Sequence, residues 1–152
     1  MATLQAHCLN LACGNTLRSD DGIGPYLAQW AQEKFADSPT IRVISRQQWT
    51  PDLAEDIAHA ASVLFIDCSL QQAPGEVLLT EVQAAVSDTH ATHHASAEQL
   101  LALARDLYNN HPIHAQLLTI GAGSTELGEN FSGAVLDAIP EACKALERAV
   151  RE

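Results

Sequence analysis

Residues 8–24 read CLNLACGNTLRSDDGIG, an apolar run followed by a loop that contains three glycines. The run Cys8–Cys13 has the length and composition of a buried strand, and Gly14 provides the turn that ends it. Apolar residues then recur at helical spacing from Ile23 to Phe35. A strand that leads through a loop into a helix is the repeating unit of α/β proteins.

The rest of the chain continues this alternation of strands and helices. Thr50 is expected to cap one helix, and Ser96 with Gln99 three positions later forms a capping box for another. A last helix is expected from Gly133 to Val150, with a kink at Pro140. Short apolar runs predict four further strands, at Ile41–Ile44, Val63–Ile66, Glu76–Val82 and Leu117–Ile120.

The connection between the third and fourth predicted strands is short. Only the eight residues Cys68–Gly75 separate them, whereas a parallel crossover needs about a dozen or more. The fourth strand is therefore expected to run antiparallel, at an edge of the sheet. We predict a single domain over residues 1–152. It is a three-layer α/β/α sandwich whose twisted, five-stranded sheet is mostly parallel, with one antiparallel edge strand.

Composition restricts the partners of the protein. Nineteen Asp and Glu against eight Lys and Arg give a net charge of −11, which disfavours nucleic acid and anionic membrane surfaces. The same charge serves simple solubility equally well. The sequence has no secretory signal, no apolar run of about 20 residues and no C-x-x-C pair among its four cysteines. We therefore expect a cytoplasmic protein with reduced thiols and no membrane insertion.

Polar residues are expected to gather beyond the carboxyl ends of the parallel strands, where α/β proteins bind their ligands. The first strand leads to the loop with Asp21, the third ends at Asp67, and His93 stands just before the helix that Ser96 opens. That helix must run back to begin the fifth strand, so its first turn lies at the same edge. Two carboxylates and an imidazole suit a divalent transition metal ion, with coordination positions left for water or substrate.

Ordinary structural roles compete with this interpretation. An Asp at a strand end often caps a loop, and five of the seven histidines lie between residues 90 and 114, as in a solvated polar segment. The chemistry alone does not choose between His93 and His94. The glycines of the first loop can serve turn geometry. A phosphate cradle is disfavoured there, because Asp20 and Asp21 would repel the anion.

The sequence contains no conventional nucleophile motif. It has no G-x-S-x-G elbow, and Ser124, which follows three small residues, is a distant imitation of one. Cys13 and Cys68 stand at strand ends and could reach the cleft to pair with a histidine. Each cysteine suits the role of a buried small hydrophobe as well.

Residues 14–24 resemble the G-N-x-L-x-x-D-[DE]-G-x-G signature of the nickel–iron hydrogenase maturation endopeptidases. The resemblance continues in order along nearly the whole chain, at Val63–Asp67, Ala73–Gly75, Thr92–His93, Thr119–Gly121 and Glu126–Gly128. It implies that Asp21, Asp67 and His93 are the nickel-binding residues. The family's histidine stands three residues before the helix cap, which favours His93 over His94.

The chain departs from the family pattern after the second strand. Some members carry Asp-Gly-Gly-Thr there, and this chain has Ser45–Gln48 instead. The departure argues against a role for an acid at this point and suggests a different substrate partner.

The resemblance implies an endopeptidase that removes the C-terminal extension of a nickel–iron hydrogenase large-subunit precursor once nickel has been inserted. Asp21, Asp67 and His93 would engage nickel carried by the precursor, or another divalent ion in its place. The ion would position the scissile peptide and polarise its carbonyl group or a bound water. A nickel-sensing maturation chaperone that cuts nothing is the main alternative. A small-molecule hydrolase that uses Cys68 or Ser124 is a third interpretation.

Overall fold

The apolar run Cys8–Cys13 forms β1, an inner strand that is buried along its whole length. β1 pairs in parallel with β2 (Ile41–Arg46) on one side and with β3 (Ser62–Ser69) on the other. β5 (His114–Gly121) continues the sheet in parallel beyond β3, and β4 (Val77–Glu81) joins β5 antiparallel. The strand order is β2-β1-β3-β5-β4, so β4 is an edge strand.

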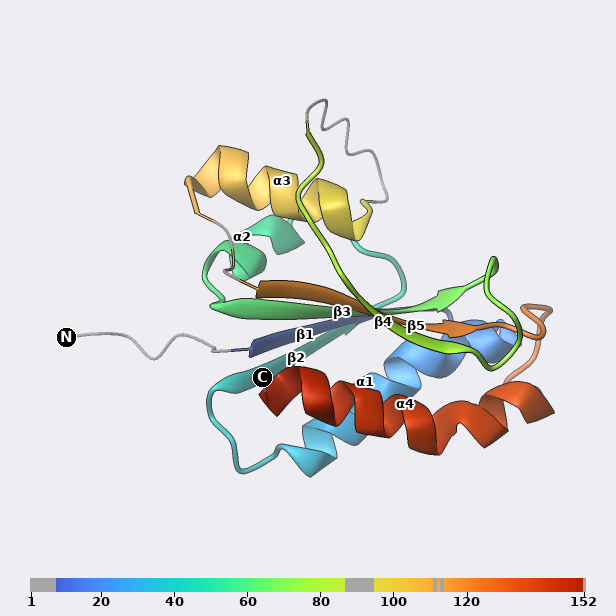
Figure 1. Cartoon of the computed structure of the whole chain (residues 1–152). Helices are drawn as coiled ribbons and strands as arrows, with labels where there is room; N and C mark the ends of the chain where they lie inside the picture. Colours follow the sequence, from blue (N-terminus) through green and yellow to red (C-terminus); the bar gives the residue numbers. More distant parts are fainter. Residues whose placement is uncertain (1–7, 87–94, 111, 113, 152) are drawn as a thin grey trace.

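Helices cover both faces of this sheet, as Figure 1 shows. α1 (Ile23–Lys34) and α4 (Gly133–Arg151) pack on one face. α2 (Leu53–Ala58) and α3 (Ala97–Tyr108) pack on the other. Each face has its own apolar core, because successive side chains of a strand point to opposite sides of the sheet. On the α2–α3 side the ring of Trp49 meets Phe65 edge-on at 5.2 Å.

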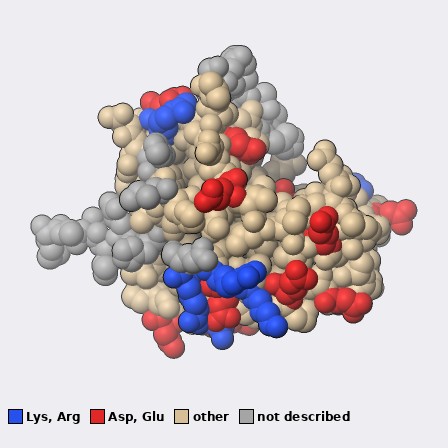
Figure 2. All heavy atoms as spheres, in the orientation of Figure 1, with Lys and Arg blue, Asp and Glu red and all other residues tan. Residues whose placement is uncertain are grey.

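The computed structural model describes residues 8–86, 95–110, 112 and 114–151. Within these residues, no helix has the length and apolar character needed to cross a membrane. Acidic side chains are spread over the face seen in Figure 2, and basic side chains gather over the C-terminal half of α4, with a smaller basic group over α3. This distribution agrees with a largely solvated role for the net charge of −11.

The predicted architecture is confirmed, including the antiparallel edge strand. The connection from β3 to β4 turns at residues 73–76, where the Glu76 N–H donates to the Ala73 carbonyl at 2.9 Å. It is held against the end of β5, because the Gly75 N–H donates to the Gly121 carbonyl and the Gly121 N–H donates to the Glu76 carbonyl, both at 2.8 Å. The capping box is confirmed as well. The Ser96 hydroxyl accepts from the Gln99 N–H at 3.1 Å, and the Gln99 side chain accepts from the Ser96 N–H at 2.9 Å.

Some element ends differ from the prediction. α2 begins at Leu53 and its cap position is Asp52, because the Thr50 hydroxyl donates to the Asp52 carboxylate and a turn precedes the helix. β3 continues through Asp67 to Ser69, because its ladder with β5 extends that far. α4 runs from Gly133 to Arg151, one residue past the predicted end, with Pro140 inside it, and the kink at Pro140 stays a prediction.

Candidate functional site

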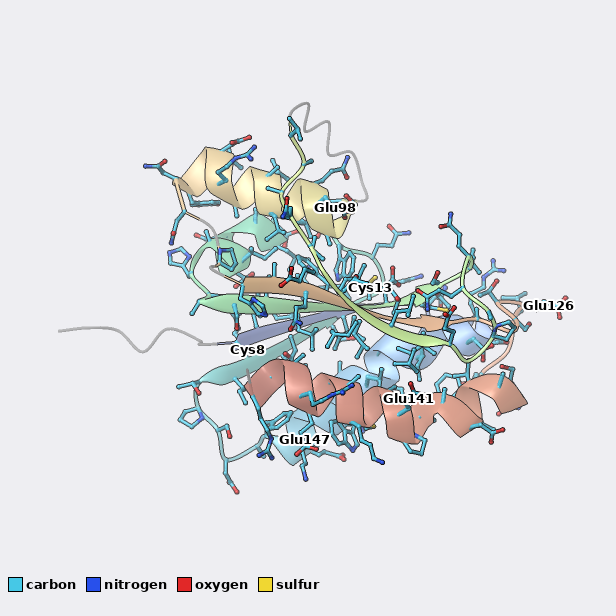
Figure 3. The ribbon with its side chains drawn as sticks, in the orientation of Figure 1. Cys8, Cys13, Glu98, Glu126, Glu141 and Glu147 are labelled. Atoms are coloured by element: carbon cyan, nitrogen blue, oxygen red, sulfur yellow. The ribbon has the colours of Figure 1, made fainter. Side chains whose placement is uncertain are left out.

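Side chains of neighbouring strands form a row across the sheet near its carboxyl edge. Asp67 in β3 pairs with Thr119 in β5, and Thr119 pairs with Leu78 in β4. Phe65 lies in the core under α2 and α3, so Asp67, two residues later, points to the same face. Cys13, the last residue of β1, belongs to this face too and lies below the first turn of α3, where Glu98 stands (Figure 3).

A cavity of about 800 Å³ opens above this row. Asp21 and Asp67 both line it, as do the residues that begin α3. The structure thus brings two of the three predicted ligand residues to one cavity, and their role as ligands stays a prediction. The remaining lining comes from the first loop, the segment after β2, and the ends of β1, β3 and β5, including Cys13, Gly14, Asn15, Arg18, Gln47, Gln48, Trp49, Leu70, Leu117 and Thr125.

Asp21 is held in place by the loop that precedes α1. It lies in the short 3-10 helix η1 (Ser19–Gly22), and its Oδ2 accepts from the Asn15 N–H at 2.7 Å. Gly14 and Gly24 allow this loop to pack tightly. A Cβ on Gly14 would stand 2.0 Å from the Asp21 carbonyl oxygen, and one on Gly24 would stand 2.2 Å from that of Cys13. Gly14 and Gly24 therefore have a structural role, which is the close approach of two backbone segments.

The neighbouring acid, Asp20, has a separate role. Its side chain is fully buried and accepts hydrogen bonds from the N–H groups of Gly123, Ser124 and Ser132 and from the Ser132 hydroxyl, at 2.7–2.9 Å. Burial alone would raise the pKa of Asp20, but the hydrogen bonds from Ser132, Ser124 and Gly123 outweigh it and lower the pKa. Asp20 thus ties the Asp21 loop to the segment between β5 and α4.

Asp67 lies in a less polar setting than Asp20. Its Oδ1 accepts from the Cys68 N–H at 2.7 Å, and the Cys13 thiol also hydrogen-bonds to the carboxylate. Burial is the largest influence on this group, and with the nearby charge of Asp21 it raises the pKa of Asp67 to about 6 despite both hydrogen bonds. Asp67 is therefore a carboxyl group that titrates close to neutral pH.

This raised pKa predicts how Asp67→Asn changes stability with pH. A folded-state pKa of about 6, above the unfolded value, means that the folded protein binds an extra proton between about pH 4 and pH 6. Stability from Asp67 is thus present in acid and is lost as the pH rises through 6. We expect urea unfolding to show Asp67→Asn more stable than wild type at pH 7.5, by up to roughly 2 kcal/mol.

The same comparison at pH 4 should show little difference between the two proteins. Asp37→Asn changes an exposed acid after α1 and is the matched control. It is expected to leave the free energy of unfolding unchanged at both pH values. A difference in unfolding free energy between wild type and Asp67→Asn that does not change with pH would contradict the raised pKa of Asp67.

The candidate nucleophiles are poorly suited to attack. Burial raises the pKa of the Cys68 thiol to about 12, with added effects from Asp21, Asp67 and Asp20, and Cys68 packs toward α1 and α4. Burial also raises the pKa of Cys13. The Ser124 hydroxyl accepts a hydrogen bond from the Glu126 N–H. The Ser124 N–H donates to the Asp20 carboxylate, and the Ser124 carbonyl accepts from the Asp20 N–H. These contacts argue against the hydrolase interpretation based on Cys68 or Ser124.

The third predicted ligand, His93, and its alternative, His94, lie outside the described residues. Ala95 is the first described residue after them and lines the cavity, with its N–H bound to the Trp49 carbonyl at 3.1 Å. Within the part of the chain that the structure describes, no three His, Cys, Asp or Glu side chains are grouped to hold a metal ion. The described residues therefore supply two carboxylates, and the histidine stays a prediction.

Sequence reasoning missed two features of this site. It treated Asp20 only as a neighbour of Asp21, whereas Asp20 fixes the loop from within. It also considered only a histidine as the partner of Cys13, whereas the parallel register carries the end of β1 beside Asp67 in β3. Strand parity relative to Leu11 and Phe65 is the signal that would have placed Cys13 and Asp67 on one face.

Comparison with known proteins bears on the fold. No protein-family model and no curated protein sequence matches the chain. Among solved structures, the hydrogenase maturating endopeptidase HybD from E. coli superposes with a TM-score of 0.72 at 19% identity, over 95% of this chain and 92% of that one.

Two archaeal structures give the same result. The [NiFe] hydrogenase maturation protease HycI from Thermococcus kodakarensis has a TM-score of 0.72 at 16% identity, over 97% of this chain and 94% of that one. HybD from the same organism has a TM-score of 0.69 at 22% identity, over 95% of this chain and 99% of that one. The chain therefore has, over nearly its whole length, the fold of the hydrogenase maturation endopeptidases.

Proposed function

We propose that this protein is an endopeptidase that removes the C-terminal extension of a nickel–iron hydrogenase large-subunit precursor after nickel insertion. The observation that carries the proposal is the cavity at the carboxyl edge, where Asp21 and Asp67 stand together in a fold shared with hydrogenase maturation endopeptidases. The motif of residues 14–24 supplies Asp21, and the strand before the cavity supplies Asp67. The reaction takes place in the cytoplasm.

Nickel enters as part of the substrate in this proposal. Carboxylate oxygens and an imidazole nitrogen suit a divalent ion of this kind, so Asp21, Asp67 and His93 bind the nickel that the precursor presents. Asp21 is kept in position by the Asn15 N–H, and Asp67 by the Cys68 N–H. Both carboxylates are thus oriented before the substrate arrives, which favours binding in a fixed geometry.

Cleavage requires attack on a peptide carbonyl without a protein nucleophile. Water adds to the carbonyl carbon and gives its proton to a carboxylate of the cavity, and the C–N bond then breaks as the leaving nitrogen takes up a proton. The high pKa of Cys68 and the engagement of Ser124 in its turn favour water over a covalent intermediate.

The test compares nickel-loaded and nickel-free precursor. We expect intact-mass measurement to show loss of the C-terminal peptide only when nickel is present, with cleavage at least about 100-fold slower after nickel removal, because the ion supplies both positioning and charge. Equal shortening of the nickel-free precursor would contradict nickel recognition. Nickel-dependent binding with no change in mass would instead support the non-cleaving maturation chaperone.

A further inference from the structure

Three exposed leucines lie in the loops that border the cavity: Leu70 lines it, Leu17 precedes the lining residue Arg18, and Leu127 follows the lining residue Thr125 by two positions. Leu17 is 56% exposed, Leu70 is 77% exposed and Leu127 is 78% exposed. They come from three separate loops, which follow β1, β3 and β5. We refer to Leu17, Leu70 and Leu127 as the leucine rim. Single exposed leucines are ordinary, but several exposed leucines in the loops that border one cavity are typical of a binding surface.

Backbone contacts place Leu17 beside Leu127, and the Ala122 N–H, which donates to the Ser69 carbonyl at 2.9 Å, brings the residue before Leu70 beside the loop after β5. The Gly128 N–H donates to the Leu17 carbonyl at 2.9 Å, and Arg18 forms a parallel bridge with Gly128, so Leu17 and Leu127 lie on adjacent chain segments. Leu70 lines the same cavity as Arg18 and Thr125. In Figure 1 the loops after β3 and β5 lie at the same end of the sheet, and Figure 3 places Glu126 at the outer end of this region.

The rim loops are fixed by hydrogen bonds. The Ser19 hydroxyl donates to the Glu126 carbonyl at 2.7 Å, and the Ser19 N–H donates to the Gly128 carbonyl at 2.8 Å. Asp20 binds the start of the same segment through Gly123 and Ser124. Leu17 and Leu127 are thus presented on a framework that needs little ordering when a partner binds, which favours affinity.

The charges around the rim indicate the character of its partner. Glu126 and Glu129 flank Leu127 in the sequence, and Asp21, Asp67 and Glu98 line the cavity behind the rim. Among the described lining residues, Arg18 is the one that carries a Lys or Arg charge. A surface complementary to this arrangement has apolar side chains flanked by Lys or Arg.

We propose that the leucine rim is the docking surface for the protein substrate, which it contacts at an apolar patch flanked by basic residues. The inference rests on the proposed function, since it takes the nickel-loaded large-subunit precursor as the occupant. The rim lies outside the two carboxylates of the cavity, so it contributes to substrate binding and not to the bond-breaking step.

The test uses the triple variant Leu17→Ser/Leu70→Ser/Leu127→Ser. Initial rates on nickel-loaded precursor give KM and kcat, and binding measured at low temperature gives Kd. We expect KM and Kd to rise roughly 100-fold, because a few apolar anchors dominate such interfaces, while kcat stays within about 3-fold. Leu107→Ser changes a leucine that is 65% exposed in the last turn of α3, far along that helix from the cavity, and should change neither value.

The association rate tests whether the partner surface carries basic residues beside its apolar patch. Glu126→Gln/Glu129→Gln should lower the association rate several-fold at low ionic strength, and the difference should vanish at high salt. An association rate that is unaffected by both changes would overturn the basic flanks of the partner surface.

The remaining outcomes show whether this inference, the proposed function or both fail. Unchanged KM and Kd in the triple variant, while wild type cleaves, would overturn the rim and leave the function standing. Rim-dependent binding without any cleavage would overturn the function and support the rim. Neither binding nor cleavage by wild type would overturn both. A wild-type dimer in sedimentation that the triple variant abolishes would show that the rim contacts a second copy and would overturn the partner assignment.

Discussion

Replacing Asp67 with asparagine is expected to slow cleavage of the nickel-loaded precursor by about 10³-fold or more, which corresponds to roughly 4 kcal/mol of transition-state stabilisation. Asparagine keeps an oxygen that can accept the Cys68 N–H and the Cys13 thiol, so the local packing is preserved. It lacks the charge that binds the ion and the basicity that accepts a proton from water. The readout is the single-turnover rate, followed by intact mass.

Stability distinguishes this loss from unfolding. Asp67→Asn is expected to be at least as stable as wild type at neutral pH, because burial raises the pKa of Asp67 to about 6 and disfavours the charged form. Asp21→Asn should show a similar loss of rate, and Asp37→Asn should cleave normally. Equal rates for wild type, Asp21→Asn and Asp67→Asn would contradict the site.

The histidine can be assigned by the same assay. His93→Ala is expected to lose activity to a similar extent, and His94→Ala should stay within about 3-fold of wild type. The reverse result would move the third ligand to His94. No effect from either change would leave the two carboxylates without the predicted histidine.

Replacing Asp20 with asparagine is expected to destabilise the protein by about 3 kcal/mol or more. Four donors converge on this fully buried carboxylate, and an asparagine amide would direct its own N–H groups at some of them. Hydrogen bonds to a charged group contribute about 1.5–3 kcal/mol each, and a buried donor left without a partner costs about 1–3 kcal/mol. In a domain of this size the midpoint of thermal unfolding should fall by roughly 6–12 °C.

The pH dependence of Asp20→Asn checks the cause. Because the folded-state pKa of Asp20 is lowered, its contribution is present above the unfolded value near 3.9 and is lost as the pH falls through the folded value. The gap in unfolding free energy between wild type and Asp20→Asn should therefore narrow in acid. If the midpoint of thermal unfolding of Asp20→Asn lies within about 1 °C of wild type at neutral pH, Asp20 does not stabilise the contact between the Asp21 loop and the segment between β5 and α4.

The fold could be predicted because its signals are local. Apolar runs mark the strands, and the eight residues from Cys68 to Gly75 are too few for a parallel crossover, so β4 had to turn back. The exact ends of the strands and helices were harder to predict from the sequence. Asp67 looks like a strand terminus in the sequence, yet its pairing with Thr119 keeps it within β3.

The candidate site could be predicted only in part, because contacts between residues far apart in the sequence decide some of its features. Asp20 and Asp21 are adjacent acids, and nothing near them in the chain indicates that one is buried and the other faces the cavity. The difference is decided by Ser124 and Ser132, more than 100 residues away. Strand order, in contrast, brought Asp21 and Asp67 to one edge, because parallel strands end together.

The hydrogen bonds of Asp20 have a consequence for the order of assembly. They join positions that are 103 to 112 residues apart, so the loop that carries Asp21 cannot be fastened until residues 123–132 have been synthesised. Contacts of such separation close late in folding, since a long segment must be ordered first. A growing chain therefore lacks a fastened cavity until the segment after β5 has been synthesised, although β1, β2 and β3 are complete by Ser69. The activity proposed above is therefore expected only after residues 123–132 have joined the fold.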